Sequence, residues 1–215
     1  MSIEPSEAEE VFRNLPGEPI RLLRVGNLDQ LVDGSALLSN SAVPEPPYWA
    51  HLWPSARVLA QMLSAEGPRL RGRRVIEVGC GLGLPGLVAA RCGASVVLTD
   101  RNQQAITFAG RSVARNRLSA VVLSMDWRAS PLRASFDLCL VADATYDPST
   151  NDHLVEFAER HLAPDGEVWV AESVRAEEAQ LPRLLADRFD LTVQRIPATE
   201  EGRRVWVRVL QGRRR

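Results

Sequence analysis

The chain has 215 residues, of which 45% are apolar, and its 26 basic and 27 acidic residues give a net charge of −1. This length can bury one substantial core but is short for two full domains. With so little net charge, no long-range field would draw the chain to nucleic acid or to an anionic membrane. We therefore expect a single domain that binds neither.

All the basic residues are arginine, which excludes mechanisms that need a lysine as Schiff base, general base or phosphate ligand. Cys80, Cys92 and Cys139 lie in apolar or glycine-rich surroundings, which favours reduced interior thiols. The acidic N-terminus does not resemble a signal peptide, and no apolar run reaches ~18 residues. A cytoplasmic monomer without a membrane segment or metal site is expected.

Residues 1–46 are expected to form an N-terminal extension packed on a core domain of residues 47–215. Ser6 to Leu15 predicts a short helix, because a serine and a glutamate three positions later have capping-box spacing. Ile20 to Val25 and Leu28 to Val32 predict two strands joined by a Gly-Asn turn. A proline-rich linker then leads to Tyr48, Trp49 and Trp53, and a helix is predicted from Pro54 to Leu63.

After residue 74, apolar runs alternate with segments of helical length, which predicts strands buried on both faces of a mostly parallel sheet. The five predicted strands are Val75–Val78, Ser95–Thr99, Val121–Ser124, Phe136–Val141 and Glu167–Glu172. Helices are predicted from Leu84, over Asn102–Arg115 and over Asn151–Leu162. Asp190–Arg195 and Arg204–Leu210 predict an antiparallel hairpin at the sheet edge, which completes a seven-stranded, Rossmann-like α/β fold.

A glycine-rich loop follows the first buried strand and gives the strongest functional signal. Glu77, Gly79, Gly81 and Gly83 precede the helix at Leu84, so the backbone can approach a nucleotide-like ligand closely. The glycines at 81, 83 and 86 also match the weak dinucleotide-binding pattern G-x-G-x-x-G. The additional Gly79, the acid at position 77 and the absence of a lysine for a proton relay favour S-adenosylmethionine, whose ammonium a carboxylate can attract.

Acidic and aromatic residues follow the next strands, at the sheet edge where ligands bind in open α/β folds. Asp100 can accept hydrogen bonds from both ribose hydroxyls of an adenosine. Asp126 can accept from the adenine amino group, and Trp127 can pack on the ring. Asp143 and Tyr146 follow the fourth strand, beside the expected position of the reactive methyl group.

The glycine loop, Asp100, Asp126-Trp127 and the D-x-x-Y sequence at Asp143 to Tyr146 resemble the seven-β-strand protein lysine methyltransferases of methyltransferase family 16. The run Pro47 to Pro54 is similar to the branch that includes the electron-transfer-flavoprotein β-subunit lysine methyltransferase. This resemblance implies a lysine methyltransferase that uses S-adenosylmethionine. It also implies cofactor contacts from Trp53, Gly79, Gly81, Asp100, Trp127 and Ala142, with Asp143 and Tyr146 shaping the acceptor site.

The methyl acceptor stays open at this point. The resemblance favours a protein lysine, for which Asp143 can orient the amine and Tyr146 can exclude water. A small heterocyclic amine is the alternative, and a cofactor-binding module without turnover is a third hypothesis. The run Glu45-Pro46-Pro47-Tyr48 resembles the D-P-P-Y motif of nucleic-acid amino methyltransferases, but it stands upstream of the sheet, so a base substrate is not favoured.

Overall fold

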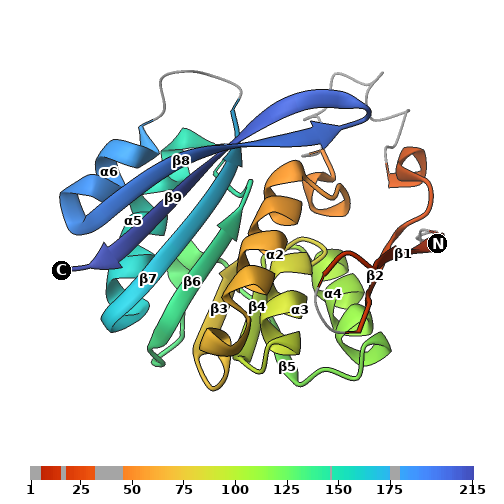
Figure 1. Ribbon diagram of the computed structural model, residues 1–215, viewed down its shortest axis with the longest axis horizontal. Helices are drawn as coiled ribbons and strands as arrows, with labels where there is room; N and C mark the ends of the chain where they lie inside the picture. Colours follow the sequence, from red (N-terminus) through yellow and green to blue (C-terminus); the bar gives the residue numbers. More distant parts are fainter. Residues whose placement is uncertain (1–5, 16–17, 32–45, 146, 175–179) are drawn as a thin grey trace.

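A computed structural model describes residues 6–15, 18–31, 46–145, 147–174 and 180–215. Its centre is a seven-stranded sheet with the order β5-β4-β3-β6-β7-β9-β8 (Figure 1). The five strands from β5 to β7 pair parallel, and β9 runs antiparallel to both of its neighbours, β7 and β8, so the predicted Rossmann-like architecture is confirmed.

The five parallel strands lie where the apolar runs predicted them. They are β3 (Arg74–Val78), β4 (Ser95–Asp100), β5 (Ala120–Ser124), β6 (Phe136–Ala142) and β7 (Leu162–Ser173). Within β6, Leu138 and Leu140 belong to the core on one face of the sheet, whereas Cys139 and Val141 belong to the core on the other. Both faces are therefore buried, which explains why the sequence of this strand shows no polar alternation.

Helices cover both faces of the sheet (Figure 1). One core contains residues of α2 (Pro54–Glu66), α3 (Leu84–Arg91) and α4 (Gln103–Arg115), and the other contains residues of α5 (Asn151–His161) and α6 (Leu181–Arg188). Asn102 caps α4 by accepting from the Gln104 and Ala105 amides, so the predicted start of that helix is correct. In the part of the chain that the structure describes, no helix has the length and apolar character to cross a membrane.

The C-terminal hairpin is longer than the sequence predicted. β8 (Phe189–Glu200) and β9 (Arg203–Arg214) pair along their whole length through a two-residue turn at Glu201 and Gly202. Both turn residues have positive φ, 49° and 78°. β9 also pairs with β7 as far as Val207, and beyond that the hairpin continues as a two-stranded ribbon. Figure 1 shows this ribbon reaching past the sheet above α2.

The N-terminal segment differs from the prediction. Glu7–Phe12 forms β1, not a helix, and pairs antiparallel with β2 (Ile20–Val25). Leu28–Leu31 is a short 3₁₀ helix, so the predicted second strand and its Gly-Asn turn are wrong, and Val32 lies outside the described residues. The capping-box spacing is a signal within one segment, and here pairing with the next strand, β2, outweighs it.

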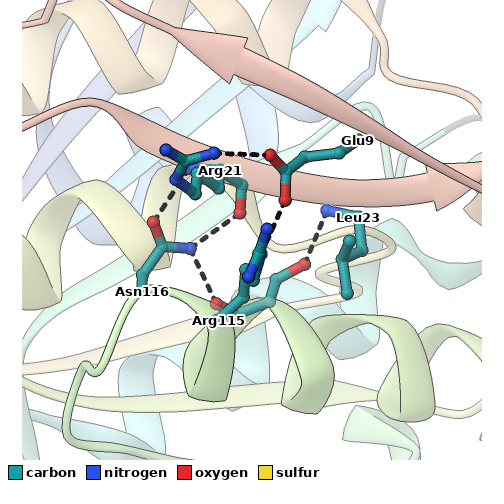
Figure 2. A network of polar contacts seen from close by, with 6 residues as sticks. Glu9, Arg21, Leu23, Arg115 and Asn116 are labelled. Atoms are coloured by element: carbon teal, nitrogen blue, oxygen red, sulfur yellow. Dashed lines mark hydrogen bonds and ion pairs between the residues drawn. The ribbon is translucent and has the colours of Figure 1, made fainter.

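A network of polar contacts attaches this hairpin to α4 (Figure 2). Glu9 bridges Arg21 of β2 and Arg115 of α4, each at 2.7 Å. Asn116 accepts from the Arg21 amide at 2.8 Å and donates to the Arg21 carbonyl at 2.7 Å. The Ser112 hydroxyl accepts from the Leu23 amide at 3.0 Å. Side chains at the end of α4 thus bond backbone groups of β2 in the place of a further strand. The division of the chain into an extension and a core domain at residue 46 stays a prediction.

Asn116→Ala is expected to lower the free energy of unfolding by about 0.5–1.5 kcal/mol, because it removes the exposed hydrogen bonds to the Arg21 backbone, which water replaces in part. Urea unfolding followed by circular dichroism measures this change. Thr107→Ala on the same helix is the matched control, because the Thr107 hydroxyl is exposed and bonds only within α4. Equal midpoints for the two variants would contradict the role given to Asn116.

Candidate functional site

A cavity of about 250 Å³ lies where the carboxyl ends of β3, β4 and β6 meet the segment before α2. Eight of the predicted site residues line it: Trp53, Gly79, Gly81, Gly83, Asp100, Trp127, Ala142 and Asp143. The fold therefore gathers residues from positions 53 to 143 into one site, at the sheet edge that the strand order favours for ligands.

The glycines of the loop after β3 are required by their backbone geometry and by close neighbours. Gly79, Gly81 and Gly83 have positive φ of 62°, 51° and 79°, a region that favours glycine. A Cβ at Gly79 would come within 2.7 Å of the Ala144 Cβ, and one at Gly81 within 2.9 Å of the Trp49 carbonyl oxygen. Side chains here would push the glycine loop away from the loop after β6 and from the aromatic segment before α2.

Glu77 lies behind this loop and is not among the described residues that line the cavity. Its carboxyl is 1% exposed, and its Oε2 accepts from the Gly86 N–H of α3 at 2.7 Å. Burial, with a smaller contribution from the charge of Asp100, raises the pKa of Glu77 from 4.5 to about 8. The hydrogen bond from Gly86 acts in the opposite direction and lowers this pKa. Glu77 therefore shapes the loop from beneath instead of facing the cavity.

The first turn of α3 has few backbone donors left for an anionic ligand. Pro85 has no N–H, Gly86 donates to Glu77, and Leu87 donates to the Gly83 carbonyl. A dinucleotide places its pyrophosphate on free amides at this end of the helix. The G-x-G-x-x-G spacing at this loop therefore does not create a pyrophosphate site.

Asp100 ends β4 and is held at both carboxylate oxygens. Oδ2 accepts from the Gly81 N–H at 2.9 Å and Oδ1 from the Asn102 N–H at 2.8 Å. The residue is 8% exposed, and burial raises its pKa, although the backbone hydrogen bonds from Asn102, Gly81 and Arg101 and the charge of Arg101 lower it. An ionised carboxylate has about four lone-pair sites, so these three backbone donors still leave one for a ligand hydroxyl.

The two predicted adenine contacts after β5 lie differently. Trp127 lines the cavity, and its ring would be 3.3 Å from a Cβ at Gly79. Asp126 caps the short 3₁₀ helix of residues 127–129 and forms an ion pair with Arg128 at 2.5 Å. The Arg128 hydrogen bond lowers the pKa of Asp126, and the residue is not among the described ones that line the cavity. The Trp127 indole therefore lies at the cavity, whereas the Asp126 carboxylate is bound by Arg128.

Aromatic residues before α2 form the opposite wall of the cavity. Tyr48–Ala50 is a 3₁₀ helix, and the Trp53 indole donates to the Tyr48 carbonyl at 3.0 Å. Trp49 packs on Phe108 with ring centroids 5.5 Å apart and meets the glycine loop at Gly81. This contact of Trp49 was not predicted. The Pro-Pro-Tyr run leads into this 3₁₀ helix, whereas the loop with Asp143 follows strand β6.

The loop after β6 contains Asp143, whose backbone has a φ of 48°. Its Oδ1 accepts from the Ser173 N–H at 2.7 Å, and its Oδ2 accepts from the hydroxyls of Ser55 and Ser173 at 2.6 and 2.7 Å. Ala142 precedes it in the cavity wall. Tyr146, the second predicted acceptor residue, lies outside the described residues.

Two serines that hold Asp143 were not predicted as site residues. Ser173 ends β7, the neighbour of β6, so the rule that parallel strands end at one edge could have identified it. Ser55 lies in the first turn of α2, and nothing in its sequence surroundings marks it.

Stability should fall with rising pH because of Glu77. Between 4.5 and about 8 the folded state retains a proton that the unfolded state has released, so this carboxyl lowers stability by up to about 1.4 kcal/mol per pH unit across the window. Glu77→Gln keeps a neutral side chain at every pH and should remove this contribution. Urea unfolding from pH 5 to pH 9 tests it, and an equal slope in the variant and the wild type would contradict the assignment.

Comparisons with known proteins agree with this geometry. Residues 47–181 match a family model described as lysine methyltransferase, methyltransferase family 16. The histone-arginine methyltransferase METTL23 of Xenopus laevis is 32% identical over 160 residues, which cover 70% of this chain and 68% of that protein. The protein N-lysine methyltransferase METTL21A of Danio rerio is 36% identical over 137 residues, 60% of this chain and 62% of that protein.

Among solved structures, the 16S rRNA N2 G1207 methyltransferase RsmC of T. thermophilus, in complex with AdoMet and guanosine, has a TM-score of 0.71. The match covers 98% of this chain and 52% of that one, and its 20% sequence identity shows a shared fold alone. Membership of a branch within the family stays a prediction. The chain belongs to the lysine methyltransferase family, methyltransferase family 16, and is an S-adenosylmethionine-dependent methyltransferase.

Proposed function

We propose that this chain is a protein-lysine N-methyltransferase in which Asp143 receives the acceptor amine. The observation that carries the proposal is the state of the Asp143 carboxylate, which lines the cavity. An ionised carboxylate offers about four lone-pair sites, and three of them are used by Ser55 and Ser173. One site on Oδ1 is left for an incoming N–H donor.

The residues present fit S-adenosylmethionine. The Asp100 carboxylate would accept from a ribose hydroxyl, the Trp127 indole would pack on the adenine, and the glycine loop would let the backbone lie against the ligand. Trp53, on the opposite wall, would close the site. The first turn of α3 lacks the open amides that a phosphate needs, and this cofactor has no phosphate.

When bound, the cofactor supplies a sulfonium methyl group, so that an N–C bond forms on the acceptor as the C–S bond breaks. The acceptor must first lose a proton to solvent, because a lysine of pKa ~10.4 is neutral only about once in 2,500 molecules at pH 7. Asp143 would then hold one remaining N–H and fix the direction of the lone pair. We assign it this orienting role, and Tyr146 is proposed to wall the acceptor channel.

The choice between lysine and arginine rests on the same carboxylate. A guanidinium binds a carboxylate best through two parallel N–H groups, one to each oxygen. Oδ2 of Asp143 already accepts two hydrogen bonds, so this fork would compete with both serine hydroxyls. A primary amine needs a single acceptor, which Oδ1 provides. The relatives include both a histone-arginine and an N-lysine methyltransferase, and this geometry favours the lysine.

Asp100→Ala should weaken S-adenosylmethionine binding at least about tenfold, because a charge-assisted hydrogen bond to the ribose is lost together with the bond that holds the Gly81 N–H. Isothermal titration calorimetry measures the dissociation constant. Asp152→Ala is the control, because Asp152 is exposed on α5, away from the cavity. Failure of the wild type to bind this ligand, together with binding of a nicotinamide dinucleotide, would overturn the cofactor assignment.

Incubation with tritiated S-adenosylmethionine should label lysine side chains of an acceptor protein, and core histones and calmodulin are suitable probes. The chain has no lysine of its own, so a methyl group found on lysine Nζ by mass spectrometry belongs to the acceptor. Asp143→Ala should reduce this labelling about a hundredfold while cofactor affinity is retained. Labelling of small heterocyclic amines, and of no protein in a lysate, would instead support the small-molecule alternative.

A further inference from the structure

We propose that Ser55 and Ser173 are positioning residues that hold the Asp143 carboxylate so that it accepts one N–H, which makes the site selective for an amine over a guanidinium. This inference rests on the function proposed above. It adds two residues, and a source of substrate selectivity, that neither the family motif nor the cavity lining identifies.

The two serines come from different parts of the fold. Ser55 is 0% exposed in the first turn of α2, and its hydroxyl donates to Oδ2 at 2.6 Å. Ser173 ends β7 and donates twice, from its N–H to Oδ1 and from its hydroxyl to Oδ2, each at 2.7 Å. Three donors at these distances are charge-assisted hydrogen bonds, which fix both the position and the rotation of the carboxylate.

The loop itself is held separately, so the serines act on the side chain. The Asp143 N–H donates to the Ala171 carbonyl at 2.9 Å, which continues the pairing of β6 with β7. Farther along the loop, the Thr145 hydroxyl donates to Glu172 Oε2 at 3.1 Å, and Glu172 forms a buried ion pair with Arg208 of β9 at 2.5 Å. Loss of one serine hydroxyl would thus release the carboxylate while the loop keeps these anchors.

Selectivity follows from which lone pairs are occupied. With both hydroxyls on Oδ2, the one open site lies on Oδ1, and a guanidinium fork finds no second acceptor. Without the Ser55 hydroxyl, Oδ2 gains an open site and the carboxylate can accept from both arms of the fork. Removal of Ser55 should therefore weaken amine transfer and favour arginine relative to lysine.

The test uses the full chain, tritiated S-adenosylmethionine and core histones, with methylated lysine and arginine separated by mass spectrometry. Ser55→Ala and Ser173→Ala should each lower kcat for lysine about tenfold, which corresponds to loss of one charge-assisted hydrogen bond. The cofactor dissociation constant should stay within about twofold of the wild-type value. In Ser55→Ala the ratio of arginine to lysine methylation should rise.

Two variants separate positioning from a merely structural role. Ser64→Ala is the matched control, because Ser64 is a buried serine on the same helix and makes no hydrogen bond to Asp143. Ser173→Thr keeps the hydroxyl and suits a strand, so it should restore most of the activity. Equal kcat values for Ser55→Ala and Ser64→Ala, or an unchanged arginine-to-lysine ratio, would overturn the proposal.

A second readout does not depend on turnover. The Ser173 amide proton, bonded to Oδ1, should exchange slowly with solvent in the wild type, and its NMR signal should move in Ser55→Ala but not in Ser64→Ala. If no acceptor is labelled by the wild type, the proposed function fails, and this signal alone decides whether the serines hold Asp143. A signal unmoved by Ser55→Ala would refute the positioning role.

Discussion

The buried hydrogen bond from the Gly86 N–H to Glu77 ties the end of β3 to the first turn of α3, and the cavity depends on it. Position 86 accepts no side chain, since a Cβ there would lie 2.2 Å from Leu98 and 2.7 Å from Glu77. The bond fixes where the glycine loop leaves the strand and removes an amide that a phosphate could use. One interaction therefore shapes the cofactor cavity and makes it unsuitable for a dinucleotide.

The second constraint is the close approach of three segments that are distant in the sequence. The Trp49 carbonyl contacts Gly81, Ala144 contacts Gly79, and Ser55 contacts Asp143. The segment before α2 thus touches the glycine loop and, through the first turn of its helix, the loop after β6. A ligand that orders the aromatic wall would also act on Asp143, because the wall and Ser55, which bonds Asp143, belong to one continuous stretch of chain.

The sequence predicted the sheet well because strands buried on both faces are long apolar runs that depend little on their neighbours. It failed at residues 6–15, where the capping-box spacing was a local signal and pairing of β1 with β2 was decided by contacts with Arg115 and Asn116, far along the chain. The prediction of the site residues had the same limit, since local patterns do not show contacts between distant positions. Asp100 and Asp143 were predicted from their place at strand ends, whereas Ser55 contacts Asp143 across 88 positions, which no local pattern indicates.

Asp126 and Glu77 show why a residue type at the right sheet edge does not by itself fix a role. Both were predicted as cofactor contacts from their positions, yet Asp126 is engaged with Arg128 and Glu77 is buried beneath the loop. The Asp126 carboxylate accepts from Arg128, two positions later in the chain, and the Glu77 carboxyl accepts from the Gly86 N–H, nine positions later. Asp100 and Asp143 are also held by hydrogen bonds, but both residues line the cavity, so a ligand can reach an acceptor site that these bonds leave free. Glu77 Oε1 also lacks a hydrogen-bond partner, but it is buried beneath the loop. Access to the cavity, more than charge or free lone pairs, therefore distinguishes a carboxylate that can bind a ligand from one that supports the fold.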